Sequence, residues 1–135
     1  MAAFASTEWL QAFHEAINAS KAYEDAAKTW EGDFYFIVEP ESSQTKPVYM
    51  YVDLWHGKSR RVFIAKSESE MQPEFVISAP TNVWKKVVEK RLDPIQGLIT
   101  RQLKLKGNLA KIMRAVKAAQ ELVNCTTKVQ TEFST

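Results

Sequence analysis

The chain has 135 residues and a formal net charge of +2 at pH 7, and hydrophobic residues make up 45% of it. This composition excludes disordered and collagen-like chains, and the length suits one domain over residues 1–135. A chain of this size buries about two thirds of its unfolded surface, so a core can form without cross-links. Its one cysteine, Cys125, excludes an internal disulfide and favours a reducing compartment.

No targeting or membrane segment is recognised in the sequence. The apolar runs fall well short of the ~20 residues that span a bilayer. The first residues lack the basic and apolar regions of a secretory signal, and Ala2 stands where myristoylation needs glycine. We therefore expect a cytoplasmic protein.

The small net charge conceals two unlike parts of the chain. Between Lys85 and Lys117 there are ten basic and two acidic residues, so this basic segment carries +8 and the rest of the chain −6. Aromatic residues have the opposite distribution, since none lies between Lys85 and Glu132. The chain thus combines an aromatic, acidic part with an aliphatic, basic part.

Two helices are predicted at the N-terminus. Ser6 is a suitable N-cap, because apolar residues recur at helical spacing from Leu10 to Ile17. Ser20 is a second N-cap, for a short helix that Gly32 would end.

Four strands are predicted next, at residues 34–38, 48–55, 61–65 and 75–77, where β-branched and aromatic residues predominate. Pro40 ends the first strand, and a polar loop covers residues 41–46. His56 and Gly57 supply a tight turn between the second and third strands. These four consecutive strands are expected to form a meander.

The second half of the chain returns to helices. Thr81 can cap a helix over residues 81–92, and Asp93 followed by Pro94 is a strong start for a short second one. Leucine and lysine alternate within residues 100–106, which predicts a fifth strand at a sheet edge. Asn108 caps the last helix, and the tail from about residue 125 is expected to be flexible. Separate blocks of helices and strands indicate an α+β fold.

The strands at 34–38 and 48–55 are apolar or aromatic on both faces, whereas a sheet with one solvated face has polar residues on that face. One interpretation is that helices or a dimer partner cover both faces. The other is that part of this surface lines an apolar cavity. The residues at the alternate positions are Tyr35, Ile37, Tyr49, Tyr51 and Trp55.

Residues that could carry catalysis are few. His14 and His56 are the only histidines, and neither has a cysteine or histidine at metal-ligand spacing. Cys125 lacks the sequence context of a reactive thiol, and no phosphate-binding or zinc-hydrolase motif is present. We expect no metal, no cofactor and no enzymatic activity. The enzymatic alternative is an enzyme that acts on acyl thioesters, with His14 or His56 as base.

The basic segment has two interpretations, a solvated face or a surface for an anionic partner. The alternative function for the chain is therefore a nucleic-acid or protein interaction module that uses residues 85–117. Proteins that bind single strands interleave basic residues with aromatic ones, and this segment has no aromatic residue. Nucleic acid is thus the less favoured partner.

Residues 92–108, with the sequence LDPIQGLITRQLKLKGN, resemble the signature of the sterol carrier protein type 2 family. The aromatic N-terminal half, with its two helices and a strand after Glu31 and Gly32, is similar to prokaryotic single-domain members. The chain has Leu98 and Ile99 where the family usually has phenylalanines, which implies a differently shaped cavity. The matching residues are Pro94, Leu103, Lys104, Leu105, Lys106, Gly107, Asn108 and Met113.

The resemblance implies a five-stranded sheet covered by helices, with an internal apolar tunnel. It further implies non-catalytic binding or transport of a fatty acid, fatty acyl-CoA, phospholipid or sterol. An anionic membrane surface would be a transient partner, and the chain would act as a monomer or a homodimer.

The same resemblance suggests the residues of a ligand site. Arg101 and Lys104 are expected near the anionic end of the ligand, because they lie beside the family motif. The expected tunnel lining is Phe36, Met50, Phe63, Ile77, Trp84, Leu98, Ile99, Leu105, Ile112 and Val116.

Overall fold

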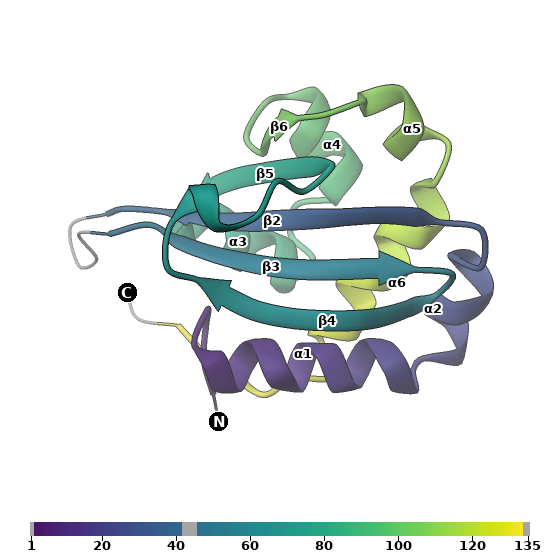
Figure 1. Cartoon of the computed structure of the whole chain (residues 1–135), viewed down its shortest axis with the longest axis horizontal. Coiled ribbons are helices and arrows are strands. Elements are labelled where there is room, and N and C mark those ends of the chain that lie inside the picture. The colour runs from purple at the N-terminus through teal and green to yellow at the C-terminus, as the bar shows by residue number, and fades with distance from the viewer. Residues whose placement is uncertain (1, 42–45, 134–135) are drawn as a thin grey trace.

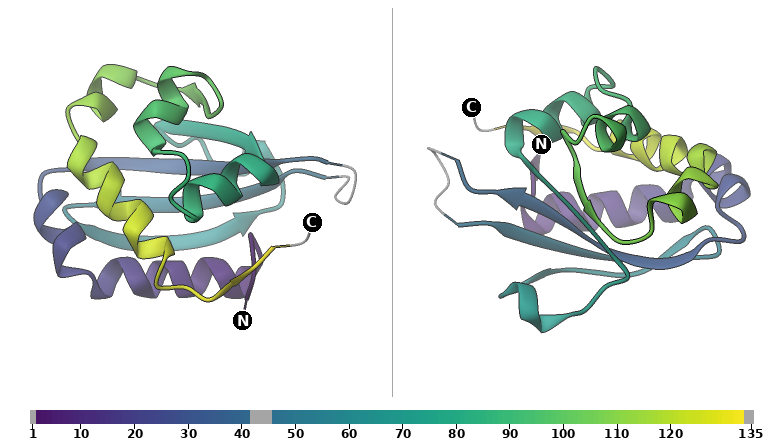
Figure 2. Two further views of the ribbon diagram at one scale, coloured as in Figure 1. Left: turned by 180° about the vertical axis from the view of Figure 1, so that it is seen from behind. Right: turned by 90° about the horizontal axis from the view of Figure 1, so that it is seen from above.

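A mixed five-stranded sheet carries helices on one of its faces, which gives the α+β fold that the sequence predicts (Figures 1 and 2). The computed structural model describes residues 2–41 and 46–133. No helix in these two ranges is both long enough and apolar enough to cross a membrane. The elements are β1 (Ala2–Ala3), α1 (Thr7–Ala19), α2 (Lys21–Ala26), β2 (Glu31–Glu39), β3 (Val48–Trp55), β4 (Lys58–Ala65), η1 (Glu68–Glu70), β5 (Phe75–Pro80), α3 (Thr81–Val88), α4 (Pro94–Ile99), β6 (Lys104–Lys106), α5 (Leu109–Met113), α6 (Val116–Thr126) and β7 (Thr131–Glu132).

The two N-terminal helices begin where the sequence predicts. The Ser6 hydroxyl accepts a hydrogen bond from the Trp9 amide at 3.1 Å, and the Ser20 hydroxyl accepts one from the Tyr23 amide at 3.0 Å. These bonds satisfy amides that the first turn of a helix leaves without partners. The second helix ends at Ala26, before the predicted end, because residues 31–32 already belong to strand β2.

The order of strands in the sheet is β4-β3-β2-β5-β6. Strands β2, β3 and β4 form an antiparallel meander, but β5 pairs parallel to β2. The predicted four-strand meander is therefore wrong. Helix α1 packs against β4, and the fully buried Phe75 of β5 stacks on Phe34 of β2 with ring centroids 5.1 Å apart. Pairing beside β2 thus places the Phe75 ring against Phe34 within the core.

Helix α3 is shorter than the apolar pattern suggests, whereas helix α4 is short, as predicted. Helix α3 ends at Val88, and its N-cap is Pro80, which makes no side-chain capping bond. Helix α4 starts as predicted, since the Asp93 carboxylate accepts hydrogen bonds from the Ile95 and Gln96 amides at 3.0 and 3.1 Å. The turn that follows α4 takes up residues 100–103 of the predicted strand 100–106, so the edge strand β6 covers only Lys104–Lys106.

The single C-terminal helix that the sequence predicts is two helices. Asn108 caps α5 as expected, but the chain leaves helical geometry at Ala115, with φ −124° and ψ 37°. Helix α6 then runs to Thr126, and its end is buried, with Cys125 2% exposed. The break at Ala115 changes which residues of α6 face the sheet.

The structure differs from the expected flexible tail. Strand β7 pairs in parallel with β1, and the Trp9 indole N–H donates to the Thr131 hydroxyl at 2.8 Å. These contacts hold both ends of the chain together (Figure 1). Residues 134–135 of the predicted tail and residues 42–45 of the predicted loop lie outside the described residues.

A second, smaller apolar cluster covers the face of the sheet opposite the helices. Its buried residues include Tyr35 and Tyr51, and the segment that joins β4 to β5 lies over them, with η1 on that side (Figure 2). The Met71 amide donates to the Tyr35 hydroxyl at 3.0 Å, and the Tyr51 hydroxyl donates to Asp33 at 2.7 Å. Residues of the same chain therefore cover part of the second face.

Gly57 is a position where the fold depends on glycine. Its φ is +82°, and a Cβ there would lie 2.7 Å from the carbonyl oxygen of Glu24. We expect Gly57→Ala to lower the free energy of unfolding by about 2–3 kcal/mol, through backbone strain and this close approach. Urea unfolding followed by circular dichroism measures the change. A loss below about 0.5 kcal/mol, the range of an ordinary surface substitution, would contradict the close approach of α2 to this turn.

Candidate ligand-binding site

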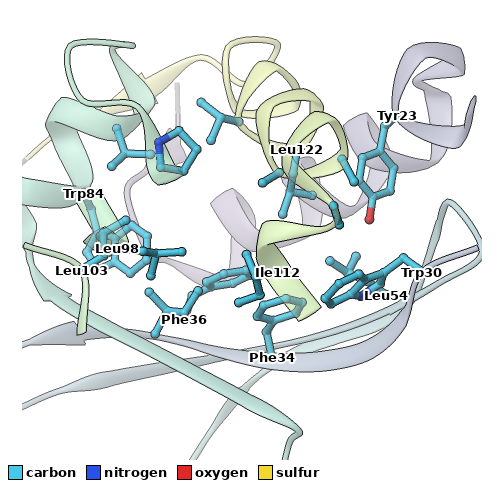
Figure 3. Close-up of a pocket in the computed structure, with 17 residues that line it drawn as sticks. Tyr23, Trp30, Phe34, Phe36, Leu54, Trp84, Leu98, Leu103, Ile112 and Leu122 are labelled. Carbon is cyan, nitrogen blue, oxygen red and sulfur yellow. The ribbon is translucent and has the colours of Figure 1, made fainter. Parts of the chain in front are cut away.

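An apolar cavity of about 100 Å³ lies between the sheet and the helices that cover it (Figure 3). None of the residues that line it carries a charge. Trp84, Leu98 and Leu103 lie at one end, and Tyr23, Trp30 and Leu54 lie at the other (Figure 3). The lining residues are Tyr23, Trp30, Phe34, Phe36, Leu54, Ile77, Trp84, Val87, Pro94, Leu98, Leu103, Ile112, Ala115, Ala118, Ala119, Leu122 and Val123.

The cavity results from a difference in side-chain size between its two walls. Phe34 and Phe36 are two residues apart in β2, so both rings point to the helix-covered face, with centroids 5.1 Å apart. The facing wall is the start of α6, where Ala118 and Ala119, together with Ala115 just before the helix, present small side chains. Methyl side chains do not reach the rings, and the remaining gap is the cavity.

Two of the aromatic walls are fixed by hydrogen bonds to the backbone. The Trp84 indole N–H donates to the Ile37 carbonyl at 3.0 Å, and the Trp30 indole N–H donates to the Gly32 carbonyl at 3.1 Å. Both indole donors are therefore satisfied by the protein, and both rings turn apolar surface toward the cavity.

A second apolar cavity, of about 70 Å³, lies between the same helices and α1. Its walls include Phe4, Trp9, Phe13 and Met50. The residues that line both cavities, and so separate them, are Phe36, Trp84, Val87, Leu122 and Val123.

The volumes of the two cavities limit which molecules they can hold without a rearrangement of side chains. An apolar protein cavity of about 150 Å³ takes up a molecule the size of benzene and stays dry. Each cavity described above is smaller than that. A long acyl chain or a sterol would therefore need the dividing side chains to move and the two spaces to join.

A polar groove of about 280 Å³ adjoins the first cavity, because Pro94 and Val123 line both. The Lys90 ammonium donates to the Asn124 side-chain oxygen at 2.6 Å, and the Asn124 amide donates to Glu121 at 3.1 Å. Lys117 pairs with the other oxygen of Glu121 at 2.9 Å. Asn124 and Lys117 both favour the charged carboxylate, so they hold the pKa of Glu121 below its usual value.

Six of the twelve predicted site residues line these spaces. Met50 lines only the second cavity, and Phe36 and Trp84 line both. Leu105 and Val116 pack against the core without lining either cavity. The residues that line the first cavity as predicted are Phe36, Ile77, Trp84, Leu98 and Ile112.

Phe63 lies on the opposite face of the sheet, against Tyr51, and does not line the cavity. A regular hairpin through His56 and Gly57 would place Phe63 beside Met50. The pairing instead shifts by one residue at Asp53, so that Phe63 pairs with Tyr51. Because alternate residues of a strand face opposite sides, a shift of one residue moves the ring to the other face.

Three further predicted residues lie outside both cavities. Ile99, at the end of α4, is 53% exposed. Arg101 is exposed in the following turn with a φ of 63°, and Lys104 pairs with Glu39 at 3.1 Å. The cations beside the first cavity are instead Lys90 and Lys117, which share the groove with the carboxylates of Asp93 and Glu121.

Sequence reasoning also missed several lining residues. Treating residues 109–123 as one helix placed Val116 in the inward stripe, whereas the break at Ala115 turns Ala118, Ala119 and Leu122 inward. The spacing of these three residues is itself helical, so a stripe of small residues was present in the sequence. Tyr23 was recognised as apolar surface of α2 but not as part of a site.

Neither histidine lies in a cavity wall. His14 Nδ1 is 2.7 Å from the hydroxyl of Ser59, and the Asn18 amide donates to the Ser59 carbonyl at 2.9 Å, so these contacts join α1 to β4. His56 lies at the turn, with Nε2 2.6 Å from a carboxylate oxygen of Glu31. Within residues 2–41 and 46–133, no three His, Cys, Asp or Glu side chains are grouped so as to hold a metal ion.

The cations of the basic segment are partly engaged within the protein. Arg91, Lys104, Lys111 and Lys117 each pair with a carboxylate, at distances from 2.7 to 3.1 Å. Lys90 is hydrogen-bonded to Asn124 as described above. These residues belong to or follow α3, β6, α5 and α6, so the charge is spread over several elements.

Comparison with known proteins relates the chain to one family. Residues 10–120 match the model of the SCP-2 sterol transfer family. A crystal structure of sterol carrier protein 2 is 36% identical, with a TM-score of 0.86, and the alignment covers 94% of this chain and 99% of that one. A search of curated proteins found no match.

Two more solved structures have the same fold. A conserved hypothetical protein of Thermus thermophilus, described as possibly a sterol carrier protein, is 36% identical with a TM-score of 0.85 over 94% of this chain and 90% of that one. Sterol carrier protein 2 of Yarrowia lipolytica, in its apo form, is 16% identical with a TM-score of 0.62 over 93% of this chain and 94% of that one. At this lower identity the likeness concerns the fold alone.

Leu122 tests the packing of the wall between the two cavities. We expect Leu122→Ala to join them and to lower the free energy of unfolding by about 2 kcal/mol, because it removes buried carbons and leaves a larger void. The matched control is Leu109→Ala at a residue that is 39% exposed, where the loss should stay within about 0.5 kcal/mol. Equal losses for the two variants in urea unfolding would contradict a packed wall at Leu122.

Proposed function

The chain belongs to the SCP-2 sterol transfer family, and on this basis we propose that it carries a hydrophobic lipid without catalysing a reaction on it. The observation that carries the proposal is the uncharged apolar cavity between α6 and the sheet. Each methylene that leaves water for such a space contributes about 0.8 kcal/mol. A chain of several methylenes can thus offset the cost of moving the wall.

We further propose that the ligand occupies a tunnel made by joining the two cavities. The side chains between them include Phe36, Leu122 and Trp84. Phe36 and Leu122 can turn about their own torsions without a change in the strand order, whereas the Trp84 indole is held by its hydrogen bond to the Ile37 carbonyl. A lipid bound there would replace dispersion contacts among the dividing side chains with dispersion contacts between those side chains and the lipid. The free protein then holds the space partly collapsed, and the ligand opens it.

The polar groove supports an anionic head group. It adjoins the cavity at Pro94 and Val123, so a chain inside the cavity can leave its head in the groove. An ammonium group has three N–H donors, and Lys90 gives one of them to Asn124. Lys90 can therefore donate to a ligand carboxylate or phosphate. Among the lipid classes considered, this favours those with a carboxylate or phosphate, namely fatty acids, fatty acyl-CoA and phospholipids, over sterols.

Ala119 tests whether the cavity binds the ligand. We expect Ala119→Leu to fill part of the space and to reduce hexadecanoic acid binding at least tenfold in calorimetric titration, while the protein stays folded. Ala110→Leu adds the same side chain at an exposed position of α5 and should leave binding unchanged. Undiminished binding by a folded Ala119→Leu protein would count against this cavity as the site.

Lys90 tests the position of the head group. We expect Lys90→Gln to weaken hexadecanoic acid binding about tenfold, the effect of losing one hydrogen bond to a charged group, and to leave hexadecanol binding unchanged. The control is Lys104→Gln, which removes a lysine whose ammonium pairs with Glu39 outside the groove. If Lys104→Gln reduces the preference for hexadecanoic acid over hexadecanol and Lys90→Gln does not, the head group lies at Lys104 and the proposed position at Lys90 is wrong.

A further inference from the structure

Tyr23 is a buried polar side chain in the wall of an otherwise apolar cavity. The residue is 2% exposed, and its hydroxyl points into the cavity above Trp30 and Leu54 (Figure 3). The other two polar groups on lining side chains, the indoles of Trp30 and Trp84, donate to backbone carbonyls. Within the described part of the chain, no hydrogen bond engages the Tyr23 hydroxyl.

The Tyr23 hydroxyl reaches the cavity space without a protein partner. Among the described residues, no fully enclosed side-chain nitrogen or oxygen lacks a hydrogen bond, so this hydroxyl is accessible from the cavity. Buried polar groups are nearly always hydrogen-bonded, and a site for water needs several polar partners. The walls around Tyr23 supply aromatic and aliphatic carbon. A hydroxyl that has no protein partner and faces a ligand cavity is suited to recognise a polar atom of the ligand.

We propose that the Tyr23 hydroxyl is a specificity-determining group that hydrogen-bonds an oxygen atom at the buried end of the lipid. This inference rests on the proposed function and refines it. The polar groove meets the cavity at Pro94, which belongs to the same helix, α4, as Leu98. Tyr23 lies at the end of the cavity opposite Leu98 (Figure 3). The favoured ligand is therefore a chain lipid that has an anionic head and a second oxygen near its far end.

The chemistry of the cavity indicates which oxygen groups fit. Burial raises the pKa of Tyr23, so the phenol stays protonated and can donate as well as accept a hydrogen bond. An ionised group at this end would have no charged partner among the lining residues. A hydroxyl or a carbonyl oxygen satisfies Tyr23 without bringing a charge into the cavity.

The test compares straight-chain fatty acids of increasing length with the ω-hydroxy acids of the same lengths. Calorimetric titration gives the affinity ratio of each pair for the unaltered protein and for Tyr23→Phe. At the chain length that reaches Tyr23, we expect Tyr23→Phe to weaken binding of the hydroxy acid about tenfold relative to the plain acid. Binding of the plain acid should be unchanged or tighter, because the variant no longer leaves a hydroxyl unpaired.

Tyr51→Phe is the matched control, since it also removes one phenolic hydroxyl from a buried tyrosine. That hydroxyl donates to Asp33 on the opposite face of the sheet. Tyr51→Phe should lower the melting temperature and leave every affinity ratio unchanged, whereas Tyr23→Phe should not lower the melting temperature.

The possible results separate the two proposals. If the acids bind and the affinity ratio is the same for the unaltered protein and Tyr23→Phe at every length, the role of Tyr23 is overturned and the carrier function stands. If neither series binds the unaltered protein, the carrier function itself fails. A ratio that changes with Tyr51→Phe instead would also overturn the role of Tyr23.

Discussion

The contact between an aromatic sheet face and an alanine-rich helix determines what this protein can bind. Phe34 and Phe36 present large rings, and Ala118 and Ala119 of α6 face them across the cavity with methyl groups. Protein interiors are otherwise close-packed, so a mismatch of this kind persists only because other contacts hold the helix in place. Helix α6 is held at several points, since it packs against α1, α2, α3 and α4. The cavity is thus a property of the whole helical layer.

The parts of the fold that depend on neighbouring residues could be predicted from the sequence. The caps at Ser6, Ser20, Asp93 and Asn108 satisfy amides two or three positions further on, so residue type and position are sufficient to identify them. The strand 48–55 was likewise predicted with its observed bounds. In each case the residues that identify the feature lie within one turn or one strand.

Features that depend on distant residues could not be predicted in this way. The register shift at Asp53 reverses the face of Phe63, and nothing in the alternation of residues 61–65 reveals it. The parallel pairing of β5 with β2 brings Phe75 into contact with Phe34, a residue that lies far away in the sequence. The sequence-based expectation for the head-group cations is Arg101 and Lys104, beside the family motif. The cations that line the groove beside the cavity are Lys90, which follows α3, and Lys117 of α6, and only folding brings these two together.

The two ends of the cavity differ in polarity, and this difference gives the site a direction. One end opens toward ammonium groups, and the other ends at an uncharged phenol. A ligand that enters with the wrong end first would place a carboxylate among carbon atoms, at a large desolvation cost. For the proposed carrier, this polarity would favour one orientation of a bound lipid over the other.

The four tryptophans are distributed so that each reports on a different region. Trp30 lies at the Tyr23 end of the first cavity, Trp84 belongs to the wall between the cavities, and Trp9 lines only the second. Trp55 lies outside both and is 36% exposed. Indole emission depends on the polarity around the ring. In variants that retain a single tryptophan, the wavelength of indole emission would thus reveal how far a bound molecule extends through the two cavities.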